Sequence, residues 1–233
     1  MNQALGTKLS DFAISSYTPS LTALINGLSV QTSTKPHILA VAQPLAQGQA
    51  SLPGTKKEIA LISRYANKIP VSQLLEAEAT IENVTKALRE CSLVHFACHG
   101  VQDTLNPTQS ALLLAGHSRL TLAQIIALSL PHADLAFLSA CQTATGAEDL
   151  SEEVVHLSAG MLLAGFRGVI GTMWSIMDSD APIVAGSVYD SILKDGEPDC
   201  AKAAYALHQA VKELRETAKA PFLSWVPFIH IGV

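Results

Sequence analysis

Two short apolar runs end in residues that together can carry out nucleophilic catalysis. The run HFACHG at residues 95–100 ends in His99 and Gly100, and the run LSACQ at residues 138–142 contains Cys141. A cysteine thiol has a pKa of about 8.5 and is little ionised at neutral pH, so a nucleophilic cysteine needs a base beside it. The His99 imidazole can accept that proton. The backbone N–H groups of Gly100 and Cys141 can stabilise the oxyanion on an attacked carbonyl, each contributing about 3 kcal/mol.

The elements around these runs follow an alternating pattern. Short apolar runs alternate with longer amphipathic stretches, which indicates βαβ units and a mainly parallel sheet. Strands are predicted at residues 12–16, 38–42, 93–97, 112–114, 135–138, 169–173 and 228–231, and helices at residues 57–66, 81–90, 121–128, 152–165, 181–193 and 200–215. If the strands before His99 and Cys141 are neighbours, both residues meet at the carboxyl edge of the sheet, where ligands bind in such folds.

Length and composition favour a globular chain built around a large core. The 233 residues are 48% hydrophobic and are expected to form one continuous domain over residues 1–233. Charged residues make up only 15%, against roughly 25% in an average domain. We therefore expect part of the surface to pack against another part of a larger protein.

Charge and cysteine usage argue against several other classes. The net charge is −5 without long runs of either sign, which argues against nucleic-acid binding. The most apolar stretch, residues 157–176, is interrupted by Arg167, so no membrane span is expected. Residues 1–10 lack a basic segment followed by an apolar one, so secretion is not expected either. The four cysteines form no CxxC pair and are expected as free thiols in the cytoplasm: Cys91, Cys98, Cys141 and Cys200.

Each candidate residue also has a purely structural interpretation. A cysteine at a strand end is commonly a small core residue. A metal site of His95, His99 and Cys141 would lack a fourth ligand and the usual zinc spacing, so His95 is interpreted as a hydrogen-bonded core histidine or as one that supports the site residues. Asp178 and Asp180 can cap the helix after them, with Pro182 in its first turn. Trp174 and Trp225 can equally serve as packing residues or as pocket walls.

Four ordered motifs resemble the CHAT domain family. They are HFACHG at 95–100, LSACQT at 138–143, AGFRGVIGTMW at 164–174 and WVPFIHIG at 225–232, and the resemblance covers residues 17–232. This family belongs to the caspase-like cysteine peptidases of clan CD and is often joined to tetratricopeptide repeats. The resemblance implies a three-layer α/β/α fold, His99 as general base, Cys141 as nucleophile, and no metal or organic cofactor. Relatives usually have a further strand and helix before the segment at residue 17, so the N-terminal part looks missing.

The resemblance also suggests a substrate preference. Gln142 stands where relatives commonly carry Glu, which removes a charge beside the nucleophile. The loop after Trp174 helps to form the specificity pocket of caspase-like enzymes, and here it contains Asp178 and Asp180. Their carboxylates favour Lys or Arg before the scissile bond, and Trp174 can form a wall of the pocket.

The sequence therefore predicts an intracellular caspase-like cysteine endopeptidase that acts on a protein or peptide substrate after a basic residue. Only nine residues separate Cys141 from Ser151, which precedes the next predicted helix. This link is too short for the processing linker that some caspases cut, so control by a tetratricopeptide-repeat or other regulatory domain is expected. Two alternatives remain: a catalytically silent CHAT signalling or scaffold module, and a small-molecule binder with fold-level support only.

Overall fold

The computed structural model describes residues 9–29, 35–46, 48–103, 105–142, 154–194, 196–216 and 218–233. Within these ranges, only the backbone is described for residues 26, 29, 140–142 and 154–156. The predicted loop at 142–150 and the predicted helix start at 152 therefore lie almost entirely outside the described residues.

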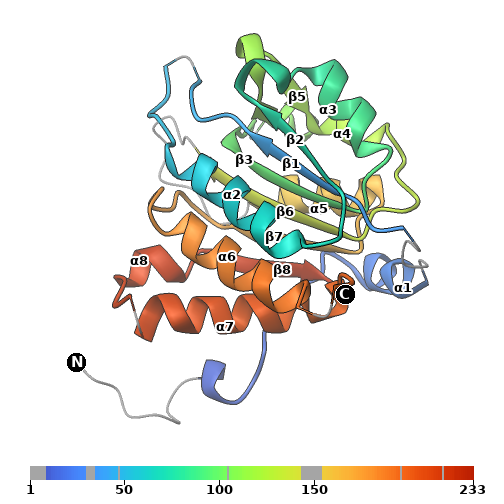
Figure 1. The fold of residues 1–233 in the computed structure, drawn as a ribbon. Coiled ribbons are helices and arrows are strands. Elements are labelled where there is room, and N and C mark those ends of the chain that lie inside the picture. Colours follow the sequence, from blue (N-terminus) through green and yellow to red (C-terminus); the bar gives the residue numbers. More distant parts are fainter. Residues whose placement is uncertain are drawn as a thin grey trace.

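A mainly parallel sheet forms the centre of the described chain (Figure 1). Its main path runs β2–β1–β3–β6–β7–β8, and these strands pair in parallel except for β8, which is antiparallel to β7. β4 and β5 form an antiparallel hairpin on the end of β3. The strands are β1 (Ile38–Ala42), β2 (Val71–Leu75), β3 (Leu93–Val101), β4 (Ala111–Leu113), β5 (Arg119–Thr121), β6 (Leu135–Gln142), β7 (Gly168–Thr172) and β8 (Phe228–Gly232).

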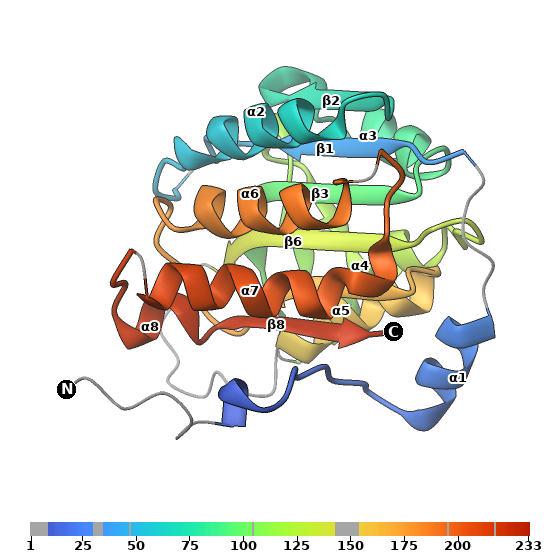
Figure 2. The same ribbon diagram turned by 60° about the horizontal axis from the view of Figure 1, so that its bottom comes forward.

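Helices cover both faces of the sheet and complete the expected three-layer α/β/α fold. α2, α6 and α7 lie on one face, and α3, α4 and α5 lie on the other (Figures 1 and 2). The helices are α1 (Leu21–Ser29), α2 (Gly54–Ala66), α3 (Ile81–Leu88), α4 (Leu122–Ile126), α5 (Val154–Ala164), α6 (Ala181–Ile192), α7 (Ala203–Glu216) and α8 (Phe222–Trp225). Within the described residues, no helix combines the length and apolarity needed to span a bilayer.

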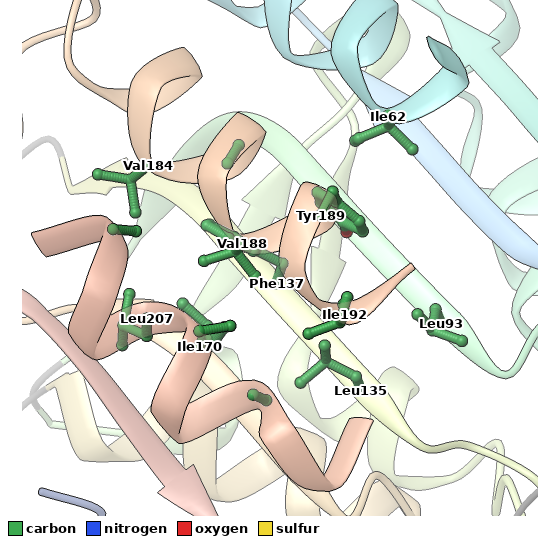
Figure 3. Close-up of a cluster of buried hydrophobic side chains, with 14 of the residues drawn as sticks. Ile62, Leu93, Leu135, Phe137, Ile170, Val184, Val188, Tyr189, Ile192 and Leu207 are labelled. Atoms are coloured by element: carbon green, nitrogen blue, oxygen red, sulfur yellow. The ribbon is translucent and has the colours of Figure 1, made fainter. Parts of the chain in front are cut away.

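The central strands are buried on both faces, which explains their continuous apolar sequences. Leu93 of β3 and Phe137 of β6 pack under α2, α6 and α7 together with Tyr189 (Figure 3). Val94 and Ala136, the alternate residues of the same strands, pack under α3, α4 and α5. This double burial fixes the register of β3 against β6, because a slip of one residue would exchange the two faces.

Side-chain caps begin two of the predicted helices. The Thr80 hydroxyl accepts a hydrogen bond from the Asn83 N–H at the start of α3. Thr121 and Gln124 form a capping box at the start of α4. Threonine is among the preferred residues at the start of a helix, so the local sequence favours the starts of α3 and α4.

The predicted strand at residues 12–16 is wrong. The chain forms a 3₁₀ turn at Leu9–Asp11 and then makes a single bridge, from Tyr17 to Ile231 of β8. Phe12 and Ile14 are 76% and 46% exposed. Their apolar pattern resembled a half-buried strand, but no layer covers these side chains.

β2, β5 and α1 are present although the sequence pattern did not predict them. β2 is only partly buried and carries Ser72 and Gln73 within five residues, which weakens its apolar signal. β5 has three residues, and its pairing with β4 is decided by tertiary contact. α1 exposes Leu21 and Leu28, so its apolar side chains do not mark a buried face.

Gly160 provides a test of the packing between α4 and α5. A Cβ at Gly160 would overlap the buried Leu122 side chain, with its Cγ at 2.5 Å. We expect Gly160→Ala to destabilise the fold by about 1–3 kcal/mol through overpacking. Gly186→Ala in α6 is the matched control, because its Cβ would meet only the flexible end of Leu61 at 3.2 Å. Urea unfolding measures both, and equal stability of the two variants would contradict this packing.

His230 makes the stability of the fold depend on pH. It is buried in β8, with Nδ1 2.7 Å from Ser16 Oγ and with no described partner for Nε2. Burial lowers its pKa from 6.5 to about 4. The unfolded chain therefore binds a proton between pH 6.5 and 4 that the folded chain does not bind, and stability falls as the pH falls through this window.

The size of this loss is about 3 kcal/mol at ~1.36 kcal/mol per pKa unit. Denaturant unfolding of wild type and His230→Gln at pH 7 and pH 4.5 measures it, because the glutamine does not titrate. We expect wild type to lose more stability than the variant. The same pH dependence in both proteins would show that His230 is not responsible.

Candidate active site

The sheet brings the two predicted catalytic positions together. β3 and β6 are parallel neighbours, and their register pairs His99 with Cys141 and Gly100 with Gln142. The side chain of Cys141 lies outside the described residues, so its thiol is not part of this description. The backbone alone therefore places the two positions side by side at the carboxyl end of the sheet.

Both strands continue beyond their predicted ends at residues 97 and 138, so His99 and Gly100 lie within β3. The extension is paired on both sides, because Gly100 is also in register with Leu112 of β4. Neighbouring strands supply this pairing, and the local sequence does not indicate it.

The hydrogen bonds of His99 define which ring nitrogen is available. His99 is 2% exposed, and its Nε2 lies 2.8 Å from the carbonyl oxygen of Ala50. A carbonyl can only accept, so Nε2 carries the proton and donates it. In the neutral ring, Nδ1 then holds a lone pair, and this buried atom has no hydrogen-bond partner among the described residues. The geometry provides an oriented base.

The loop between β1 and α2 holds the Ala50 carbonyl in place. The Leu52 N–H donates to the Pro44 carbonyl, and the Thr55 hydroxyl donates to the Leu52 carbonyl. Leu52 itself is buried in the cluster beneath α2. These contacts join the loop to the first turn of α2, so the position of the Ala50 carbonyl depends on the position of α2.

The predicted pocket residues follow β7. The Trp174 ring is half-buried, and its Nε1–H donates to the Leu223 carbonyl at 3.1 Å. Asp178 Oδ2 accepts the Gly54 N–H at 2.6 Å, so this carboxylate binds the start of α2. Asp180 is the residue before α6 and makes no side-chain cap bond. The interpretation of these two residues as caps of the helix after them is therefore wrong, because Asp180 makes no cap bond to α6 and Asp178 accepts a hydrogen bond from α2 instead.

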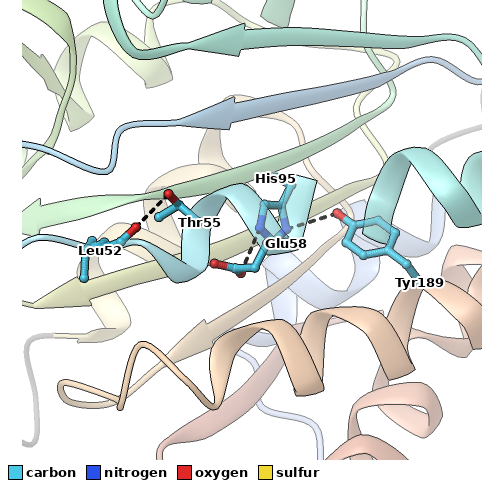
Figure 4. Close-up of polar contacts among 5 residues, drawn as sticks. All are labelled: Leu52, Thr55, Glu58, His95 and Tyr189. Carbon is cyan, nitrogen blue, oxygen red and sulfur yellow. Dashed lines mark hydrogen bonds and ion pairs between the residues drawn. The ribbon is translucent and has the colours of Figure 1, made fainter. Parts of the chain in front are cut away.

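His95 has the satisfied core position predicted for it, with two partners that were not predicted. Its Nε2 lies 3.1 Å from Glu58 Oε2, and its Nδ1 lies 3.4 Å from the Tyr189 hydroxyl (Figure 4). A signal for Glu58 was present in the sequence, because it lies on the same helical face as Ile62 and Ala66. No sequence signal identifies the Ala50 carbonyl.

Two of the other cysteines, Cys91 and Cys200, lack the surroundings of a nucleophile. Burial raises the pKa of Cys91 to about 12. Burial also raises the pKa of Cys200 well above its usual value, and Asp134 raises it further. Both groups remain thiols at neutral pH. Within the described residues, no group of three or more His, Cys, Asp or Glu side chains could hold a metal ion.

The CHAT domain family matches residues 5–233 of the chain. The chain belongs to the CHAT domain family. The CHAT chain is also similar to three solved structures: the complex of the pro- and mature domains of Porphyromonas gingivalis RgpB, the Arg-specific cysteine proteinase gingipain R, and the separase–securin complex of Saccharomyces cerevisiae.

These similarities show that the CHAT chain has a caspase-like fold. The TM-score is 0.59 for each structure, the identities are 14%, 14% and 16%, and 91%, 91% and 94% of the CHAT chain is covered. The matches span 52%, 50% and 13% of the other chains. No protein of curated function matches the sequence.

Proposed function

We propose that this CHAT chain is a cysteine endopeptidase that uses His99 and Cys141. The observation that carries the proposal is the buried Nδ1 atom of His99, which has no hydrogen-bond partner among the described residues. The hydrogen bond from Nε2–H to the Ala50 carbonyl orients the ring, and the register of β3 and β6 pairs His99 with Cys141. A base that is oriented in this way, on the strand next to one that bears a cysteine, is suited to removing the thiol proton.

In the proposed mechanism, Cys141 gives its thiol proton to His99 Nδ1, and the sulfur attacks the carbonyl carbon of the substrate peptide. The backbone N–H groups of Gly100 and Cys141 stabilise the oxyanion. His99 then donates its proton to the leaving amine, which leaves a thioester on Cys141. Water attacks the thioester while His99 accepts a proton from it, and the acid product leaves as the thiol is restored.

Substrate recognition is proposed for the loop after β7. Asp178 and Asp180 favour Lys or Arg before the scissile bond by charge complementarity, and Trp174 forms a wall beside them. Asp178 uses Oδ2 to bind Gly54, which leaves Oδ1 as a further acceptor. Gingipain R is named as an Arg-specific cysteine proteinase, which is consistent with this preference.

A regulatory domain is the proposed partner, a tetratricopeptide-repeat domain as the family resemblance implies. Large apolar side chains are exposed along the N-terminal part of the described chain, and docking against another domain would cover them: Leu9, Phe12, Ile14, Tyr17, Leu21, Ile25 and Leu28. The proposed location is the cytoplasm, because Cys91, Cys98 and Cys200 are thiols.

Covalent labelling tests the peptidase proposal. A thiol-reactive electrophile attached to an Arg-ending peptide should label wild type and should not label Cys141→Ala. His99→Ala should reduce peptide hydrolysis at least about 10³-fold, because the thiolate loses its base. Cys200→Ala is the control and should label like wild type, since this thiol is buried and protonated. Labelling that persists in Cys141→Ala would favour the silent scaffold module.

The acidic loop is tested with a second pair of variants. Asp180→Asn should lower kcat/KM for Arg-ending peptides about tenfold, and Asp178→Asn should have a similar effect because its side-chain oxygen can still accept from Gly54 while the charge is lost. A Gln-ending reporter controls for general damage and should change by less than about twofold. Preference of the wild type for Asp-ending peptides would reverse the proposed specificity.

A further inference from the structure

A buried polar network joins α2, β3 and α6 below the candidate site (Figure 4). Glu58 of α2 contacts His95 of β3, and His95 contacts Tyr189 of α6. The side chains of Glu58 and His95 are 2% and 0% exposed, and Tyr189 is also buried. Polar groups are costly at such depth unless they bond to one another, so these three side chains hold their elements in one arrangement.

The donors and acceptors of the network form a complete chain. Burial raises the pKa of the Tyr189 hydroxyl well above its usual value, so the group stays protonated and can donate to His95 Nδ1. With Nδ1 accepting, His95 carries its proton on Nε2 and donates it to Glu58 Oε2. Removal of any one member leaves another polar atom in the core without its partner.

α2 has a second attachment one turn before Glu58. The Gly54 N–H donates to Asp178 in the loop before α6. A Cβ at Gly54 would overlap the Asp178 backbone oxygen, so this close approach requires glycine. Gly54 and Glu58 are four residues apart and therefore lie on the same face of α2. The first attachment joins α2 to β3, and the second joins α2 to the loop before α6.

α2 in turn supports the Ala50 carbonyl. The Thr55 hydroxyl in its first turn donates to Leu52, two residues after Ala50. His95 and His99 are four residues apart on β3, so both side chains lie on the same face of the strand. The network therefore connects the strand that bears His99 to the helix that supports its hydrogen-bond acceptor.

We propose that Glu58, His95 and Tyr189 are positioning residues for His99. They hold α2 against β3 so that the Ala50 carbonyl meets His99 Nε2, and Nδ1 remains the free base. The proposal rests on the proposed peptidase function only for its effect on rate, because the position and protonation of the His99 ring can be measured without activity.

The first test compares two changes at Glu58. Glu58→Leu removes the acceptor at similar size, whereas Glu58→Gln keeps an oxygen that can accept from His95. We expect Glu58→Leu to lower kcat for an Arg-ending peptide about 100-fold with KM within about twofold of wild type, since a displaced catalytic group loses rate and not substrate affinity. Glu58→Gln should restore most of kcat.

The second test covers the case in which Glu58→Leu fails to fold. Tyr189→Phe keeps the ring in the core and removes only the hydroxyl, and we expect kcat to fall about tenfold. Tyr65→Phe is the matched control, because Tyr65 is a half-buried tyrosine of α2 outside the network, and its kcat should stay within about twofold of wild type.

The decisive readout is the nitrogen NMR spectrum of the His99 ring, assigned by comparison with His99→Asn. Wild type should show protonated Nε2 and unprotonated Nδ1, and Tyr189→Phe and Glu58→Leu should show a mixture of the two tautomers. If folded variants keep the wild-type spectrum and kcat, the positioning role is overturned. If wild type has the expected spectrum but cleaves no peptide, the peptidase proposal fails while the variant spectra still decide the positioning role.

Discussion

The hydrogen bond from His99 Nε2 to the Ala50 carbonyl is the contact on which the candidate site depends. It assigns the proton to one nitrogen and leaves the other as a base, and it also fixes the plane of the ring. No acidic side chain is needed for this purpose, because a carbonyl accepts the bond without adding a charge to the buried site. The site therefore requires the β1–α2 loop to stay at a fixed distance from β3.

The packing and the hydrogen bonds of α2 meet this requirement. Apolar packing of α2, α6 and α7 over β3 and β6 provides most of the burial (Figure 3). Apolar contacts have little directional preference, so they permit small shifts of a helix along the sheet. The bond between Glu58 of α2 and His95 of β3 is directional, and so is the bond from the Gly54 N–H of α2 to Asp178 in the loop between β7 and α6. These two bonds define where α2 lies.

The structural relatives show how far sequences can diverge while the sheet is retained. RgpB and separase share 14% and 16% identity with this chain at a TM-score of 0.59. A parallel sheet covered on both faces needs apolar strands and amphipathic helices in a given order, and many sequences satisfy that pattern. The proposed chemistry depends on a few positions at the carboxyl ends of β3 and β6, so the residues that determine the fold differ from those proposed for catalysis.

The sequence by itself determined the layer architecture, the starts of α3 and α4 and the motifs around His99 and Cys141, because periodicity and capping are local properties. Only the tertiary structure decided the partners of those motifs. Ala50, Glu58 and Tyr189 reach β3 from distant parts of the chain. The helical face of Glu58 indicates that this residue is buried, but no local pattern identifies His95 as its partner or Ala50 as the partner of His99. The predicted strand at residues 12–16 failed for the same reason, since a strand requires a neighbouring chain segment to pair with, and only Tyr17 obtains one.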